Sequence, residues 1–149
     1  MGGGVVKFFC DTSVLVAGSV HTHPQFVRAN PVLIMAAQNP NDFYCSLHSL
    51  AEAYSALTQM PVLPRIQPAT ALEIILDCII PCFQIVTLDT DAYLRVIANC
   101  VEDGLTGAII YDALIMHCAA TVKADRIYTF NVRHFQRALP TLASKVIAP

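Results

Sequence analysis

Three acidic residues in this sequence stand where an apolar segment ends or is interrupted. Asp11 comes directly after an apolar run, Glu52 follows a shorter one, and Asp112 is the only acidic or basic residue in a long apolar stretch. Burying an ionised carboxylate without a compensating partner costs several kcal/mol. Each of these acids is therefore expected to cap a helix, to pair with another group or to bind a cation.

If the fold brings these three carboxylates together, a hard divalent cation would relieve their mutual repulsion. Carboxylate and water oxygens are the ligands that suit Mg²⁺ or Mn²⁺. Such a cation can orient phosphate oxygens, activate a water molecule and stabilise the leaving oxygen of a displacement at phosphorus. Phosphodiester hydrolysis is the reaction that this residue set favours.

Each acid also has a structural alternative. Asp11 can cap the helix that follows it, although Thr12 and Ser13 could do the same. Glu52 stands three residues after Ser49, which is the spacing of a capping box if the helix begins there. Asp112 is an N-cap if its helix starts at that residue and not at position 108. The residues alone leave these alternatives open.

The elements that would position the acids alternate along the chain between strand-like and helix-like segments. This order predicts an α/β fold, a single domain over 1–149 built as an α/β/α sandwich with a mainly parallel central sheet. In such a fold, right-handed winding could bring all three acids to the carboxyl edge of the sheet. The expected strands lie at 5–10, 43–45, 83–86, 126–129 and 145–147, and the expected helices at 11–18, 24–38, 47–60, 69–80, 90–103, 108–123 and 133–139.

Composition restricts the class of protein. The chain has 149 residues, of which 55% are hydrophobic and 13% charged, with a net charge of −2. No apolar run reaches the length of a membrane span and no signal peptide is evident, so a cytoplasmic protein without membrane contact is expected, with part of its apolar surface covered by another chain. The charge is uneven, at −6 over 1–122 and +4 over 123–149. The basic end could steer a phosphate backbone, or be an ordinary solvated face.

The cysteines and two of the histidines are not expected to bind metal. The six cysteines contain no CxxC pair and lie in apolar runs, which indicates buried free thiols. His21 and His23 precede a proline, and this spacing is more typical of a loop than of a metal site.

Four segments together carry a resemblance to a known family. They are Phe9-Cys10-Asp11-Thr12-Ser13-Val14-Leu15, Ser49-Leu50-Ala51-Glu52-Ala53-Tyr54, Tyr111-Asp112-Ala113-Leu114-Ile115 and Tyr128-Thr129-Phe130-Asn131-Val132-Arg133-His134-Phe135. In this order they resemble the signature blocks of PIN-domain ribonucleases, especially the VapC-type toxins of toxin–antitoxin systems.

The resemblance implies an endoribonuclease that depends on Mg²⁺ or Mn²⁺, acts on RNA, forms a homodimer and is silenced by an antitoxin protein. Asp11, Glu52 and Asp112 match the metal-binding acids of the family. Asn131 stands where many members have an acid and His134 where an Asp often precedes the Phe, so one metal site is expected and not two. Asn131 completes the expected catalytic set, while the residues expected to contact RNA or support the site are Thr12, Ser13, Arg126, Arg133 and Arg137, with Thr129 in a supporting role.

Two other classes of function are open from the sequence. A phosphatase of the haloacid dehalogenase type also has an Asp after its first strand, but it usually needs a second acid two residues later, where this chain has Ser13. A catalytically decayed PIN-like module that binds RNA or protein is the alternative that Asn131 and His134 favour.

Overall fold

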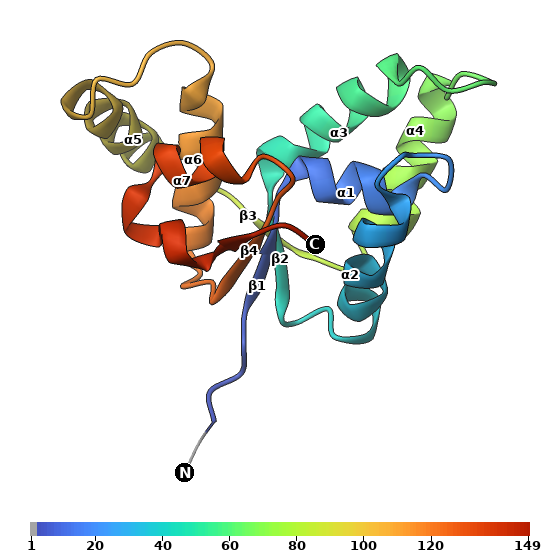
Figure 1. The fold of residues 1–149 in the computed structure, drawn as a ribbon, viewed down its shortest axis with the longest axis horizontal. Helices are drawn as coiled ribbons and strands as arrows, with labels where there is room; N and C mark the ends of the chain where they lie inside the picture. The colour runs from blue at the N-terminus through green and yellow to red at the C-terminus, as the bar shows by residue number, and fades with distance from the viewer. Residues whose placement is uncertain (1–2) are drawn as a thin grey trace.

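A computed structural model describes residues 3–149 and contains a central sheet of five strands in the order β3-β2-β1-β4-β5. All the neighbouring strands run parallel. The sheet is the common support of the helices in Figure 1, where its carboxyl edge is the upper one. Its strands are β1 (Phe8–Cys10), β2 (Phe43–Ser46), β3 (Gln84–Val86), β4 (Arg126–Tyr128) and β5 (Val146–Ile147).

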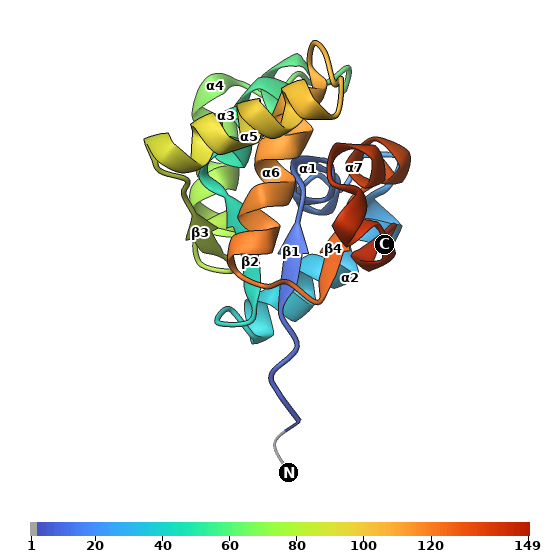
Figure 2. The same cartoon turned by 90° about the vertical axis from the view of Figure 1, so that its left-hand side faces the viewer.

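Helices cover both faces of the sheet. Those on one face are α1 (Thr12–Ser19), α2 (Phe26–Gln38), α3 (Leu47–Gln59) and α4 (Pro68–Ile74), which continues into a π-helical turn, η1 (Ile75–Ile79). Those on the other face are α5 (Thr90–Glu102), α6 (Ile109–Thr121) and α7 (Val132–Ala138), followed by a 3₁₀ turn, η2 (Pro140–Lys145). Figure 2 shows α6 in front of the sheet with α5 crossing above it.

The alternation of side chains along each strand separates two apolar cores. In β1, Cys10 packs with α1, α2 and α3, whereas the neighbouring Phe9 packs with α5, α6 and α7. Both side chains are fully buried. Successive strand residues point to opposite faces of a sheet, so a strand covered on both sides reads as a continuous apolar run.

The predicted fold class is confirmed, and the expected elements are present with small shifts of their ends. The first strand begins at Phe8 and not at position 5, and the helix predicted across Pro31 is the single helix α2. The turn η2 was not expected from the sequence. All six cysteines are free thiols, and Cys78 alone among them is only partly buried. Between residues 3 and 149, no helix is both long and apolar enough to cross a membrane.

Candidate active site

The three acids lie at the carboxyl edge of the sheet because of the elements that carry them. Asp11 is the first residue after β1, and Glu52 lies in the second turn of α3, which follows β2 directly. Asp112 is in the first turn of α6. This helix runs back along the sheet toward β4, so its first turn starts at the carboxyl edge, where ligand sites of open α/β sheets gather.

Asp11 is held by hydroxyl groups from two segments. Its side chain is only 4% exposed, and its Oδ2 accepts hydrogen bonds from Ser13 Oγ at 2.7 Å and from Thr129 Oγ1 at 2.8 Å. The same two hydroxyl oxygens accept the backbone N–H groups of Asn131 and Phe130. Asp11 occupies the N-cap position of α1, but its side chain makes no capping hydrogen bond. The two hydroxyl groups, and not a standard cap bond, are therefore the main partners of this carboxylate.

Glu52 is also free of a capping role. Ser46 caps α3, and its hydroxyl accepts the Ser49 backbone N–H at 3.0 Å, so the capping box that would occupy Glu52 does not form. Thr12 Oγ1 instead donates to Glu52 Oε1 at 3.2 Å, which joins α1 to α3. His48 lies one turn earlier on the same helix, with its Nε2 atom 3.8 Å from Glu52 Oε1.

Asp112 faces an open cleft of about 490 Å³. Because α6 begins at Ile109, Asp112 is not its N-cap and the carboxylate is available to other partners. Glu52, Asn131, His134 and Arg137 line the same cleft, as do Ala108, Ile109 and Tyr111.

Burial raises the pKa of all three carboxyl groups, and neighbouring carboxylates add to the shift at Asp112 and Glu52. The pKa of Asp112 is raised to about 6, first by burial and then by the negative charges of Asp11 and Glu52, while His134 partly offsets the effect. Burial raises the pKa of Asp11, and the hydrogen bonds from Ser13 and Thr129 partly lower it again. Burial also raises the pKa of Glu52, and His48 opposes this shift. The fold has gathered negative charge that it does not itself neutralise.

The donor set fits a hard divalent cation, but it is not a closed cage. Among residues 3–149, no three His, Cys, Asp or Glu side chains lie close enough together to form a ready-made metal site. Mg²⁺ does not require such a cage, because it usually binds one or two carboxylates and keeps several of its waters. The mutual repulsion of the acids and the open cleft beside Asp112 are the features that a hydrated cation would match.

The basic residues expected to contact RNA are divided between two edges of the sheet. Arg137 lines the cleft, and Arg133 is exposed in the first turn of α7. Arg126 is the first residue of β4 and pairs with Phe8, the first residue of β1, so it lies at the amino edge. The strand direction that brings Thr129 to the acids carries Arg126 away from them, so Arg126 lies outside the cleft.

Thr12 and Ser13 bond to the acids, and beside them lies a stacked pair of side chains that was not expected from the sequence. The hydroxyls of Thr12 and Ser13 bond to Glu52 and Asp11, which is the supporting role expected of them. His48 stacks on Tyr111, with ring centroids 5.7 Å apart and planes 7° from parallel. The pair joins α3 to α6 beside two of the acids. The i, i+4 spacing of His48 and Glu52 was the available signal for the first of these residues.

Comparison with known proteins decides the family. The family model described as PIN domain matches residues 8–138, which include all three acids and Asn131. The chain belongs to the PIN domain family. Two relatives of this PIN domain from Mycobacterium tuberculosis carry ribonuclease names. Ribonuclease VapC27 is 30% identical over 115 residues, covering 77% of this chain and 78% of the relative. Ribonuclease VapC40 is 31% identical over 123 residues, covering 83% and 85% respectively.

Two solved structures share the fold of this PIN domain. The crystal structure of PAE2754 from Pyrobaculum aerophilum matches with a TM-score of 0.65 and 20% identity, covering 96% of this chain and 90% of that one. The crystal structure of VapBC2 from Rickettsia felis, bound to a DNA fragment from their promoter, matches with a TM-score of 0.60 and 19% identity, covering 97% and 98%.

Proposed function

We propose that this PIN domain is an endoribonuclease dependent on Mg²⁺ or Mn²⁺ and the toxin of a toxin–antitoxin pair. The observation that carries the proposal is the position of the acids: Asp11, Glu52 and Asp112 all lie at the carboxyl edge of the sheet, and Glu52 and Asp112 line one open cleft. An arrangement of acids that repel one another beside an open cleft favours a cation, and the ribonuclease names of the relatives favour RNA as substrate.

The three acids would have different roles in binding the metal and the attacking water. Asp11 and Asp112 would bind the cation, and Glu52 would complete its ligands or orient the attacking water. Asn131 contributes a neutral carbonyl oxygen at the same cleft, which is why a single cation is proposed. When bound, the cation would polarise the phosphate, lower the pKa of a water molecule and stabilise the leaving oxygen.

Residues around the acids place the RNA. Arg137 lines the cleft and Arg133 is exposed on the same short helix, so both can contact phosphate oxygens beside the acids. Thr12 and Ser13 orient carboxylates through the hydrogen bonds described above, and Thr129 does so from β4. Their contribution is to hold Asp11 and Glu52 in place at the carboxyl edge of the sheet.

A homodimer in the cytoplasm and an antitoxin partner complete the proposal. Several large apolar side chains are exposed on helices, among them Leu72 and Leu76 on α4–η1 and Leu94 and Val101 on α5. Exposed apolar surface of this kind marks protein contacts. Co-expression with the product of a neighbouring reading frame should yield a complex without RNA cleavage, and light scattering of the isolated chain should give twice its mass.

The test of the nuclease is cleavage of labelled RNA by the purified chain. Cleavage should disappear with EDTA and return with Mn²⁺. Asp11→Asn and Asp112→Asn should each abolish it while keeping the circular dichroism of the parent, and the exposed Asp77→Asn should leave it unchanged. RNA binding without turnover in the parent chain would instead favour a decayed binding module, which the amide at position 131 also suits. Metal-dependent cleavage retained by either acid variant would refute the assignment.

A further inference from the structure

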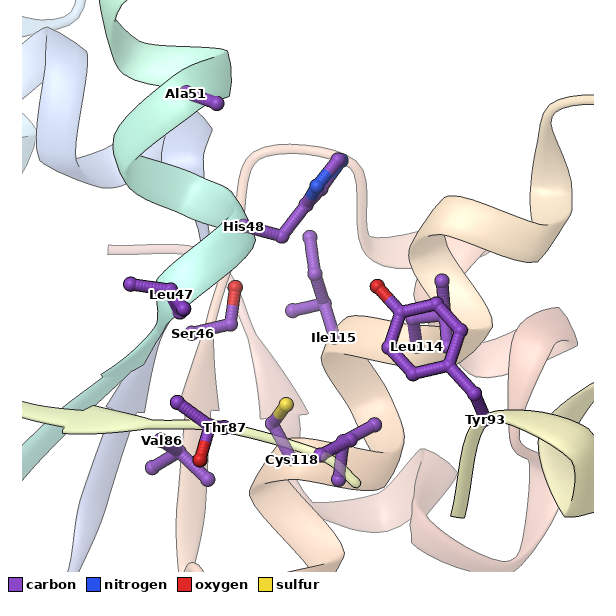
Figure 3. A pocket seen from close by; sticks show the side chains of 11 residues that line it. Ser46, Leu47, His48, Ala51, Val86, Thr87, Tyr93, Leu114, Ile115 and Cys118 are labelled. Carbon is purple, nitrogen blue, oxygen red and sulfur yellow. The ribbon is translucent and has the colours of Figure 1, made fainter. Parts of the chain in front are cut away.

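A second cavity lies at the same edge of the sheet as the acids. It has a volume of about 300 Å³ and is enclosed by the end of β2, the start of α3, the segment after β3 and one face of α6. Figure 3 shows this α3–α6 pocket, with His48 reaching across from α3 and the Tyr93 hydroxyl pointing inward from α5. The catalytic roles proposed above use none of its lining residues.

The lining of the α3–α6 pocket is apolar at its base and polar at its mouth. Val86, Leu114 and Cys118 form buried parts of the wall. Thr87 and Tyr93 are exposed residues of the lining, and their hydroxyl groups can donate or accept hydrogen bonds. No Lys, Arg, Asp or Glu lines the pocket within the described residues 3–149. A neutral, flat group with polar edges fits this wall, and a phosphate does not.

The pocket adjoins the acid cleft through one pair of stacked rings. His48 lines the pocket, lies 3.8 Å from Glu52 and stacks on Tyr111, which lines the cleft. The distance between the acids and the pocket can be estimated from the sheet. Asp11 follows β1, whereas Val86 ends β3, two strands away. Adjacent strands are about 4.8 Å apart, so the two ends are separated by roughly 10 Å. One nucleotide can span from a phosphate at the acids to a base in the pocket.

We propose that the α3–α6 pocket receives one unpaired nucleobase of the RNA beside the bond that is cut. The inference rests on the proposed nuclease function and adds to it the site that selects sequence. Protein recognition of single-stranded RNA commonly places a splayed base against aromatic side chains and reads its edge by hydrogen bonds. Here His48 and Tyr93 supply the rings, and the Thr87 and Tyr93 hydroxyls supply groups for the base edge.

The experiment has two independent changes: a substitution in the protein that fills the pocket, and an RNA that lacks one base. Ala51 is exposed on α3 at the rim of the pocket, so Ala51→Phe should block it without disturbing the core, and Ala37→Phe on the exposed side of α2 is the matched control. Cleavage rates are measured on an RNA of known cut site and on copies that carry one abasic nucleotide at each position in turn. Circular dichroism and light scattering are recorded for every variant.

In the parent chain and in Ala37→Phe, one abasic position next to the cut should lower kcat/KM by about 5- to 150-fold, the range expected for loss of one base–aromatic contact. Ala51→Phe should lower kcat/KM on intact RNA by a similar factor and show no further loss at that abasic position. Tyr93→Phe, which removes only a hydroxyl, should reduce the difference among the four bases there and leave the abasic RNA unaffected.

The inference is overturned if Ala51→Phe cleaves intact RNA with the kcat/KM of the parent. It is also overturned if the abasic position lowers kcat/KM of Ala51→Phe by the same factor as in the parent, since the two effects would then be independent. A changed molecular mass of Ala51→Phe with unchanged kcat/KM would overturn it in favour of a protein contact at the pocket. If the parent chain cleaves no RNA, the proposed function itself fails, and this inference fails with it.

Discussion

The charge of Asp112 should destabilise the metal-free protein at neutral pH. Its pKa is raised from 3.8 to about 6 in the folded chain by burial and by Asp11, so the folded state binds this proton more tightly than the unfolded state does. The group therefore favours folding at low pH, and that contribution is lost as the pH rises from about 4 through about 6. Asp112→Asn keeps the shape of the side chain and removes the charge, so it should stabilise the fold at pH 7.

The size of this effect follows from the two pKa values. The difference between 3.8 and about 6 corresponds to roughly 3 kcal/mol. Asp112 is only partly buried, and screening by solvent reduces the figure to about 1.5 kcal/mol. For a chain of this length that is a rise in Tm of about 3 to 6 °C at pH 7. At pH 4 the folded parent is already protonated at this position, so the advantage of the variant should shrink to about a few tenths of a kcal/mol.

The assay is urea unfolding of the parent, Asp112→Asn and the exposed control Asp77→Asn in EDTA at pH 7 and pH 4. The control should not show the pH-dependent gain. Adding Mn²⁺ at pH 7 should stabilise the parent more than the Asp112 variant, because a ligand that binds the folded state stabilises it more when it binds more tightly. A variant that is less stable than the parent by the same amount at both pH values would refute the reasoning, since Asp112 would then stabilise the fold through contacts that do not depend on its charge.

Three further changes test the surroundings of the acids. Thr129→Val removes the hydroxyl that bonds to Asp11 and to a backbone N–H, so it should lower the free energy of unfolding by about 1–3 kcal/mol and reduce cleavage, as measured by urea unfolding and RNA assay. Arg137→Ala should weaken RNA binding and lower the magnitude of its salt dependence by about one phosphate contact, whereas Arg126→Ala should do neither. Gly18→Ala should cost about 1 kcal/mol in the same unfolding assay, because the added Cβ would displace the end of the Leu33 side chain, 2.6 Å away, and lie 3.2 Å from the backbone oxygen of Ala29.

The positions of the acids could be predicted because they depend on local pattern and strand direction. A carboxylate after a buried strand is brought to the carboxyl edge whatever the details of packing, and this is where Asp11 lies. Asp112 was predictable on energetic grounds, as a lone charge in an apolar helix. Whether Glu52 belongs to a capping box depends on whether α3 begins at Ser46 or Ser49, and both residues can cap. The apolar pattern from Leu47 favoured Ser46, which is the N-cap in the structure.

The position of Arg126 and the omission of His48 have different causes. Arg126 begins its strand, and in a parallel sheet the first residue of a strand lies at the edge opposite the acids. Strand direction alone therefore predicts that Arg126 lies away from the acids. The stack of His48 on Tyr111 joins two helices that are far apart in the sequence, and its geometry depends on how α3 and α6 pack across β2. The α3–α6 pocket beside this stack is equally a product of packing.

The acids at the cleft differ in how strongly the protein constrains them, and this difference has a consequence for metal binding. Asp11 is fixed by two hydroxyls and is almost fully buried, while Asp112 sits in the first turn of a helix beside open solvent. A fixed ligand loses little conformational entropy when a cation binds, and an accessible one can adjust to the octahedral geometry that Mg²⁺ requires. If the proposed cation binds here, Asp11 would set where it sits. Asp112, whose pKa of about 6 makes its protonation sensitive to pH near neutrality, would then set the pH above which the cation competes successfully with the proton.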